Sequence, residues 1–130
     1  MKKTIRVTGA VLQRDGKILA AQRGQGKSLG GFWEFPGGKI EEGETPEASL
    51  ARELKEELLI DARIEEHITT TRHEYDFAII ELATYVCSLP SGEEPTLTEH
   101  EQVRWLSKEE LKDVEWAPAD VPTVEILSHA

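Results

Sequence analysis

The sequence contains very little cysteine and no long apolar segment. Cys87 is the one cysteine in 130 residues, so the chain can form no internal disulfide. This fits a reducing compartment, and we expect a cytoplasmic protein. The longest apolar stretches are far shorter than the roughly 20 residues that a membrane helix requires. The residues after Lys3 do not form an apolar signal segment, so we expect no membrane attachment.

Basic residues are also scarce. The chain has 15 lysine and arginine residues against 25 aspartate and glutamate residues, which gives a formal net charge of −10. Because phosphate polymers are bound by basic surfaces, we expect no nucleic-acid polymer as a partner. With 38% hydrophobic and 31% charged residues, the composition is that of a globular protein, and the length predicts a single domain over residues 1–130. A small phosphate-bearing substrate would need a local cluster of cations.

Hydrophobic patterning predicts a mixture of strands and helices. Strands are expected at 4–13, 18–22, 32–35, 61–74, 77–88 and 103–106. Asp15–Gly16 is a hairpin signal, and four glycines between residues 24 and 31 indicate a mobile loop. Ser107 and Glu110 form a capping box for a short helix, and a last helix is expected to begin at Asp120 or Pro122. This mixture predicts an α/β fold, with a mixed β-sheet sandwiched between α-helices.

The clearest helix is predicted from Pro46 to Leu58. Thr45 is suited to cap it, and proline is tolerated at the first helical position because its missing N–H has no partner there. Glu53, Glu56 and Glu57 are spaced i, i+3 and i+4, so they share one face of this helix. Such a face can be a merely solvated acidic surface.

Two neighbouring features favour a metal site over a solvated surface. Arg52 directly precedes the three glutamates, and Pro36–Gly38 makes a sharp turn that leads toward the same helix. Mg²⁺ prefers clustered carboxylate oxygens together with water and substrate phosphates. The helix and the turn together can supply these ligands, including a backbone carbonyl from the glycine turn.

From Gly38 to Ile60 the sequence resembles the Nudix signature. The match consists of Gly38, then Glu44, then Arg52-Glu53-Leu54-Lys55-Glu56-Glu57-Leu58-Leu59-Ile60. The resemblance implies the Nudix fold and a hydrolase that uses Mg²⁺, with Mn²⁺ as an alternative. One position departs from the signature, because Leu59 stands where glycine is expected. Glycine suits a left-handed helix end, so we expect an altered or strained helix exit but no lost ligand.

The resemblance also implies roles for individual residues. Glu53, Glu56 and Glu57 correspond to metal ligands with catalytic roles, Arg52 to the arginine that orients a glutamate, and Glu44 to an acid that supports them. The Gly37 carbonyl corresponds to a backbone ligand, and Glu99 to a loop glutamate that binds metal or activates water. The catalytic base is left open between a helix glutamate and Glu99. An exposed loop acid is the alternative for Glu99.

Outer segments resemble the MutT-like branch and the bacterial CTP pyrophosphohydrolases, on Ala21–Arg23, Trp33–Lys39 and Ala117–Pro122. The resemblance implies a phosphate contact at Arg23, and the full set of candidate substrate residues is Arg23, Phe35, Gly38, Lys39, Phe77, Trp116 and Asp120. Arg23 is a candidate for phosphate binding, because its guanidinium can pair with two oxygens. The three aromatic residues are candidates for stacking on a base, although each could equally belong to the core.

The role of Asp120 has two interpretations. It could cap the last helix, or it could accept a hydrogen bond from the exocyclic amine of a base. The second interpretation makes cytosine nucleotides plausible without excluding oxidised guanine. His73 and His100 have no metal-ligand spacing, and we interpret them as ordinary loop or strand residues.

The resemblance therefore implies a Mg²⁺-dependent pyrophosphohydrolase that converts a nucleoside triphosphate into the monophosphate and pyrophosphate. Oxidised or modified nucleotides such as 8-oxo-dGTP or modified CTP and dCTP are the expected substrates. The alternatives are a Nudix hydrolase of ADP-ribose or another nucleoside diphosphate derivative, and a non-catalytic nucleotide sensor. The expected partner is a small nucleotide, and the expected state is a monomer or homodimer.

Overall fold

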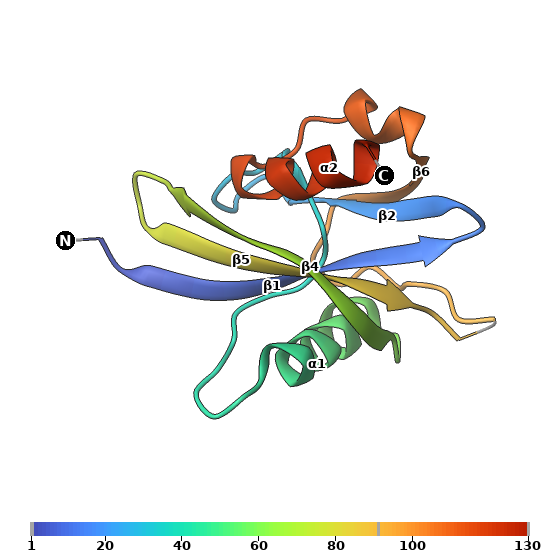
Figure 1. Cartoon of the computed structure of the whole chain (residues 1–130), viewed down its shortest axis with the longest axis horizontal. Helices are drawn as coiled ribbons and strands as arrows, with labels where there is room; N and C mark the ends of the chain where they lie inside the picture. The colour runs from blue at the N-terminus through green and yellow to red at the C-terminus, as the bar shows by residue number, and fades with distance from the viewer. Residues whose placement is uncertain (1, 91, 130) are drawn as a thin grey trace.

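The computed structural model describes residues 2–90 and 92–129. Six strands form one sheet, and helices cover both of its faces (Figure 1). The elements are β1 Thr4–Arg14, β2 Lys17–Gln22, β3 Trp33–Glu34, α1 Pro46–Leu58, β4 Arg63–Glu74, β5 Ile79–Ser88, β6 Gln102–Ser107, α2 Val121–Ser128, and two 3-10 helices at Glu109–Asp113 and Pro118–Asp120. The predicted mixed sheet between helices is confirmed.

The sheet is mixed because β1 pairs in two different ways. It forms an antiparallel hairpin with β2 across Asp15 and Gly16, both of which have positive φ angles, as the Asp-Gly signal predicted. On its other side β1 runs parallel to β5, in a register that pairs Thr4 with Ile79. The strand order is β3-β2-β1-β5-β4, and β6 pairs with β2. These pairings place the middle of β1 at the centre of the molecule.

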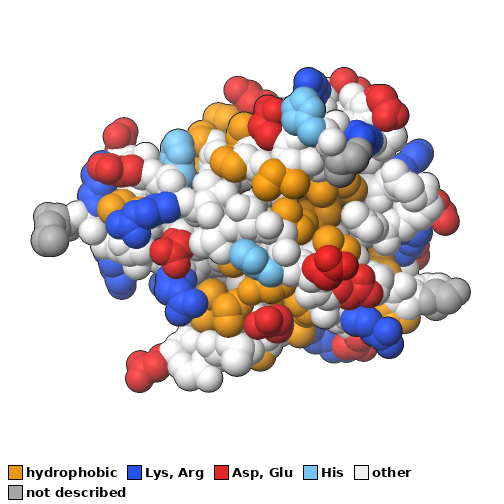
Figure 2. Space-filling model, in the orientation of Figure 1, with side chains coloured by type: hydrophobic (Ala, Val, Ile, Leu, Met, Phe, Trp, Pro, Cys, Tyr) orange, Lys and Arg blue, Asp and Glu red, His pale blue; other side chains and the backbone are white. Residues whose placement is uncertain are grey.

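Two hydrophobic clusters lie on opposite faces of this sheet. Ala10 and Leu12 of β1 pack with Leu50 and Leu54 of α1, whereas the intervening Val11 belongs to the other cluster. This alternation follows from the two-residue period of a strand and explains why β1 is apolar on both faces. The space-filling view shows apolar side chains across the middle of this face, with charged side chains both among them and around the edge (Figure 2).

Helix α1 has the predicted bounds and cap. The Thr45 hydroxyl accepts a hydrogen bond from the Ala48 N–H at 3.1 Å, and Pro46 occupies the first helical position. At the other end Leu59 is left-handed (φ 55°, ψ 41°) and its N–H donates to the Lys55 carbonyl at 3.2 Å. The helix therefore ends as a glycine would end it, and Leu59 bears the strain that the sequence predicted.

Two local predictions near the C-terminus differ in outcome. The capping box between Ser107 and Glu110 is present in both directions, but it precedes a 3-10 helix rather than an α-helix. The helix-cap interpretation of Asp120 is wrong, because its side chain makes no capping hydrogen bond to α2. The Asp120 carboxylate instead accepts a hydrogen bond from the Phe35 N–H at 3.2 Å. A long-range contact has replaced the local one.

Among the described residues, no helix is long and apolar enough to span a membrane.

Candidate functional site

The glycine turn is fastened to β1 and leaves no space for side chains. The Thr8 N–H donates to the Gly38 carbonyl at 2.8 Å, and the Ala10 N–H donates to the Pro36 carbonyl at 2.7 Å. A Cβ atom added at Gly37 would lie 2.1 Å from the Thr8 carbonyl oxygen, and one added at Gly38 would lie 1.6 Å from Glu53 Oε2. Only glycine fits at position 37, because a Cβ would meet the backbone of Thr8, whereas at position 38 a Cβ would displace the Glu53 carboxylate.

The three acids of α1 have different surroundings. Glu53 is packed against the glycine turn, and burial raises its pKa. Glu57 is more deeply enclosed, and burial raises its pKa to about 7, with smaller effects from neighbouring charges. Glu56 is more open, with a side chain that is 59% exposed. The sequence prediction that the three acids lie beside the glycine turn is supported most directly by Glu53.

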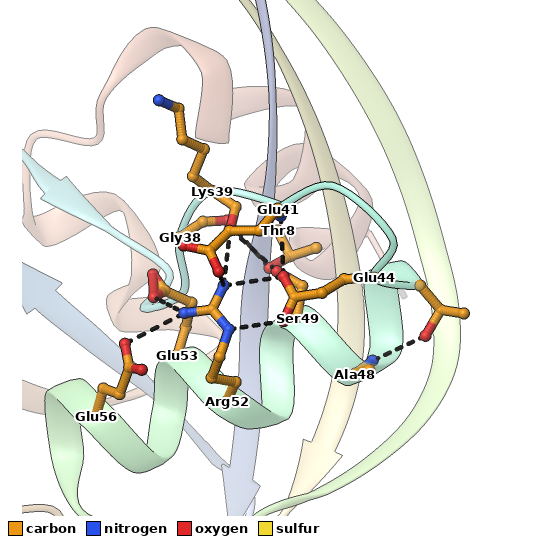
Figure 3. Close-up of polar contacts among 11 residues, drawn as sticks. Thr8, Gly38, Lys39, Glu41, Glu44, Ala48, Ser49, Arg52, Glu53 and Glu56 are labelled. Atoms are coloured by element: carbon orange, nitrogen blue, oxygen red, sulfur yellow. Dashed lines mark hydrogen bonds and ion pairs between the residues drawn. The ribbon is translucent and has the colours of Figure 1, made fainter.

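Arg52 joins these acids to the loop that precedes the helix (Figure 3). Its Nε donates to Glu44 Oε2 at 2.7 Å, and its Nη1 donates to Glu53 at 2.9 Å and to Glu56 at 3.2 Å. Its Nη2 donates to Glu44 Oε1 and to the Lys39 carbonyl. The hydrogen bond from Arg52 holds the pKa of Glu44 at about 2. One planar guanidinium therefore fixes two glutamates of the helix to Glu44 and to the glycine turn.

Glu99 and Glu57 line the same small cavity, of about 30 Å³. Lys27 donates to Glu99 Oε1 at 2.7 Å, and this hydrogen bond lowers the pKa of the Glu99 carboxyl. Arg23 also lines this cavity, so the loop glutamate and the helix glutamate meet beside two cations. Both cations are paired with carboxylates, Lys27 with Glu99 at 2.7 Å and Arg23 with Glu34 at 2.9 Å.

The described residues contain no group of three acidic, histidine or cysteine side chains gathered closely enough to hold a metal ion. Two of the helix acids, Glu53 and Glu56, form ion pairs with Arg52 instead. The Glu57 Oε1 atom is nevertheless buried without a hydrogen-bond partner among these residues. A buried carboxylate oxygen is costly unless a cation or a donor satisfies it. This unpartnered oxygen, together with the acids around it, fits a hard divalent cation.

A larger cavity of about 360 Å³ adjoins the acids. Its lining combines apolar and aromatic side chains with Arg23, Glu34 and Asp120, and it also includes Gly37, Gly38 and Glu57. Burial raises the pKa of Asp120 well above its usual range, and the nearby charge of Glu34 adds to this shift. A cavity of this size and lining is typical of a small-molecule site.

The structure brings most of the predicted substrate residues to this cavity. Phe35 and Phe77 line it, and so does Arg23, which also forms an ion pair with Glu34 at 2.9 Å. Tyr75 is a further lining residue that sequence analysis did not identify. It stacks on Phe77 with ring centroids 5.2 Å apart and an interplanar angle of 10°. Tyr75 lies between the two expected strands 61–74 and 77–88, and no motif marked it for this role.

Two predicted substrate residues lie elsewhere. Trp116 does not line the cavity; it is buried behind Phe35, with ring centroids 4.6 Å apart, and its Nε1 donates to the Leu111 carbonyl. This agrees with the alternative that Trp116 is a core residue, because its ring packs on Phe35 and its indole N–H has a hydrogen-bond partner within the protein. Lys39 is exposed, and its side chain points away from the acids in Figure 3. Its carbonyl, rather than its ammonium group, contributes to the site by accepting from Arg52.

Comparisons with known proteins agree with this geometry. Residues 7–125 match a family model described as a NUDIX domain. The chain is 41% identical over 125 residues to the CTP pyrophosphohydrolase of Escherichia coli, covering 95% of this chain and 90% of that protein. It is 37% identical over 131 residues to a putative 8-oxo-dGTP diphosphatase 2 of Mycobacterium tuberculosis, covering 92% and 84%. A solution structure of a MutT protein of the Nudix hydrolase family, from methicillin-resistant Staphylococcus aureus, is 50% identical with a TM-score of 0.81, covering 99% and 98%.

Proposed function

Because the chain belongs to the Nudix hydrolase family, we propose that it hydrolyses an oxidised or otherwise modified nucleoside triphosphate to the monophosphate and pyrophosphate. Relatives that match nearly its whole length are named as a CTP pyrophosphohydrolase and as a putative 8-oxo-dGTP diphosphatase. Both names describe an enzyme that removes pyrophosphate from a nucleoside triphosphate, and this shared chemistry is what we carry to the present chain.

The observation that carries the proposal is the junction of two cavities at Glu57. This side chain lines both the small cavity with Glu99 and the larger cavity with Phe35 and Phe77. A triphosphate bound near Glu57 would therefore have its base directed toward the aromatic lining. Arg23 and Lys27 also line both cavities, where they can bind phosphate oxygens.

The residues that would hold Mg²⁺ are Glu53, Glu56, Glu57 and Glu99, together with the Gly37 carbonyl. When bound, this ion neutralises phosphate oxygens and favours attack by water at phosphorus. Arg52 orients Glu53 and Glu56 toward the site, and the close approach of Gly38 sets the depth of Glu53. Glu57 is suited to accept a proton from water, because its raised pKa of about 7 lies close to neutral pH.

Asp120 is suited to read the edge of the base. One of its oxygens, Oδ2, is engaged by the Phe35 N–H, and the residue lines the larger cavity. As a carboxylate it accepts from an exocyclic amine, and its strongly raised pKa also lets it donate when it is protonated. A cytosine edge and an oxidised guanine edge offer different patterns of donors and acceptors, so both belong in the test.

The test is a substrate panel with identification of both products. The protein is incubated with Mg²⁺ and 8-oxo-dGTP, dGTP, CTP, modified dCTP or ADP-ribose, and products are separated by chromatography. We expect monophosphate plus pyrophosphate from at least one triphosphate, and loss of turnover in Glu56→Gln. Glu47→Gln, an exposed acid in the first turn of the same helix, serves as the matched control. Cleavage of ADP-ribose alone, or no Mg²⁺-dependent cleavage, would reject the proposal.

A further inference from the structure

Two buried acceptor atoms face the same small cavity without a hydrogen-bond partner. Among the described residues, His100 Nδ1 and Glu57 Oε1 are two of the three side-chain polar atoms in this condition. Both residues line the cavity of about 30 Å³ beside Glu99. The His100 side chain is only 5% exposed, so bulk water does not satisfy its ring. Buried polar atoms of this kind are rare in native proteins and call for an explanation.

The opposite side of the His100 ring defines its hydrogen-bonding state. Its Nε2 lies 2.9 Å from Glu34 Oε2, and Glu34 Oε1 accepts from Arg23 Nη1, also at 2.9 Å. A carboxylate oxygen accepts, so the His100 Nε2–H donates to it. In a neutral ring with its proton on Nε2, Nδ1 is an acceptor. His100 Nδ1 and Glu57 Oε1 are then two hydrogen-bond acceptors, and their residues line the same cavity.

Two acceptors require a molecule that offers two donors, and the cavity has room for one ordered water. We propose that His100 is a positioning residue: its Nε2 holds Glu34, and its Nδ1 holds a single water that also donates to Glu57 Oε1. The water satisfies both atoms with its two O–H groups. A carboxylate oxygen has two lone pairs, so this hydrogen bond leaves Glu57 able to bind a cation as well.

The proposed role rests on the proposed hydrolase function. The chain of contacts from Arg23 through Glu34, His100 and the water to Glu57 joins the wall of the nucleotide cavity to the acidic helix. At the Arg23 end, this series of contacts would affect substrate binding. At the Glu57 end, it would set the position of an acid that takes part in turnover. Partners of this kind typically contribute about 10- to 100-fold to activity.

Two substitutions separate the two ends of the ring. In His100→Gln the terminal amide can still donate to Glu34 but offers nothing at the Nδ1 position, so we expect kcat to fall about 10-fold with little change in KM. In His100→Asn the amide oxygen lies as far along the side chain as Nδ1, while the donor to Glu34 is lost. We expect KM to rise several-fold with kcat largely kept. The matched control is His129→Gln, an exposed histidine at the end of α2.

The proposal is overturned if both variants show the same fall in kcat, the same rise in KM and the same loss of stability. That result would identify His100 as an ordinary core residue. Wild-type kinetics in both variants would overturn it too. The opposite pattern, in which Gln changes KM and Asn changes kcat, would reverse the assignment of the two nitrogens and is equally contrary to it.

Two structural readouts do not depend on activity. In ¹⁵N-histidine NMR spectra at about pH 8, where an ordinary imidazole is neutral, His100 should carry its proton on Nε2, and Glu57→Gln should shift the Nδ1 resonance. A high-resolution crystal structure of the metal-free protein should show one water between the two residues. A ring protonated on Nδ1, or a cavity without water density, would overturn the proposal. If these readouts hold while no nucleotide is cleaved, the proposed function fails and the water site stands.

Discussion

The protein should be more stable to unfolding with glycine at position 59 than with alanine there. Leu59 ends α1 with φ 55° and ψ 41°, a conformation in which the Cβ of an L-residue is crowded by the backbone. This crowding costs about 1–2 kcal/mol, and it is absent in glycine. Glycine in turn loses about 0.5–1 kcal/mol through its greater freedom in the unfolded chain. The midpoints of these two ranges leave Leu59→Gly about 0.75 kcal/mol more stable than Leu59→Ala.

Comparison with alanine isolates the effect of the Cβ atom. Both variants remove the same leucine side chain, which is 53% exposed, so the loss of its partial burial cancels between them. Urea unfolding followed by tryptophan fluorescence measures the free energies, and the dependence on urea should be the same in both variants. Because Leu59 supplies no ligand, both variants should keep wild-type turnover.

Ala51→Gly, in the interior of the same helix, provides the control with the opposite sign. There glycine should lower stability by about 1 kcal/mol relative to alanine, as helix propensity requires. The reasoning is refuted if Leu59→Gly proves equal to or less stable than Leu59→Ala. That result would mean that the helix exit relaxes away from the left-handed conformation at no cost.

Three further predictions concern the acids and the turn. Glu57→Gln should slow turnover at least about 100-fold. Folding raises the Glu57 pKa from 4.5 to about 7, so between these pH values the folded state binds more protons than the unfolded state. In urea titrations with EDTA, the wild type should therefore lose stability relative to Glu57→Gln as pH rises from 4.5 to about 7. Parallel pH profiles of stability would contradict the assignment. Gly38→Ala should displace Glu53, lowering turnover by about 10-fold or more in steady-state assays, and unchanged kinetics would argue against the close approach. Arg52→Lys should lower turnover by about 10-fold, because one ammonium group cannot reach Glu44 and Glu53 as a planar guanidinium does; an active lysine variant would show that charge alone is sufficient.

Sequence patterns predicted best where the determining interactions are local. The bounds and cap of α1 follow from Thr45 and Pro46, and the β1–β2 hairpin follows from Asp15 and Gly16. In each case the signal and the structure that it specifies lie within a few residues. The spacing of the α1 acids on one helix face is local in the same sense, and it could be predicted without any knowledge of the sheet.

The residues whose roles the sequence left open, or gave no role, have distant partners. Asp120 precedes a helix and has the chemistry of a cap, yet its partner is the N–H of Phe35, far earlier in the chain. Trp116 has the shape of a stacking surface, but its place in the core is set by Phe35 and the Leu111 carbonyl. His100 showed no spacing signal, because it lies in the loop before β6 and its partner Glu34 lies on β3. Only the folded sheet brings such pairs together.

The parallel pairing of β1 with β5 has a consequence for how this protein is made. Thr4 leaves the ribosome long before its partner Ile79 has been synthesised, and the acidic helix lies between them in the chain. Contacts of such high sequence separation close late, because the entropy of a long loop must be overcome first. The sheet that holds the acidic helix in place can therefore be completed only after β5 has been synthesised, when well over half of the polypeptide exists.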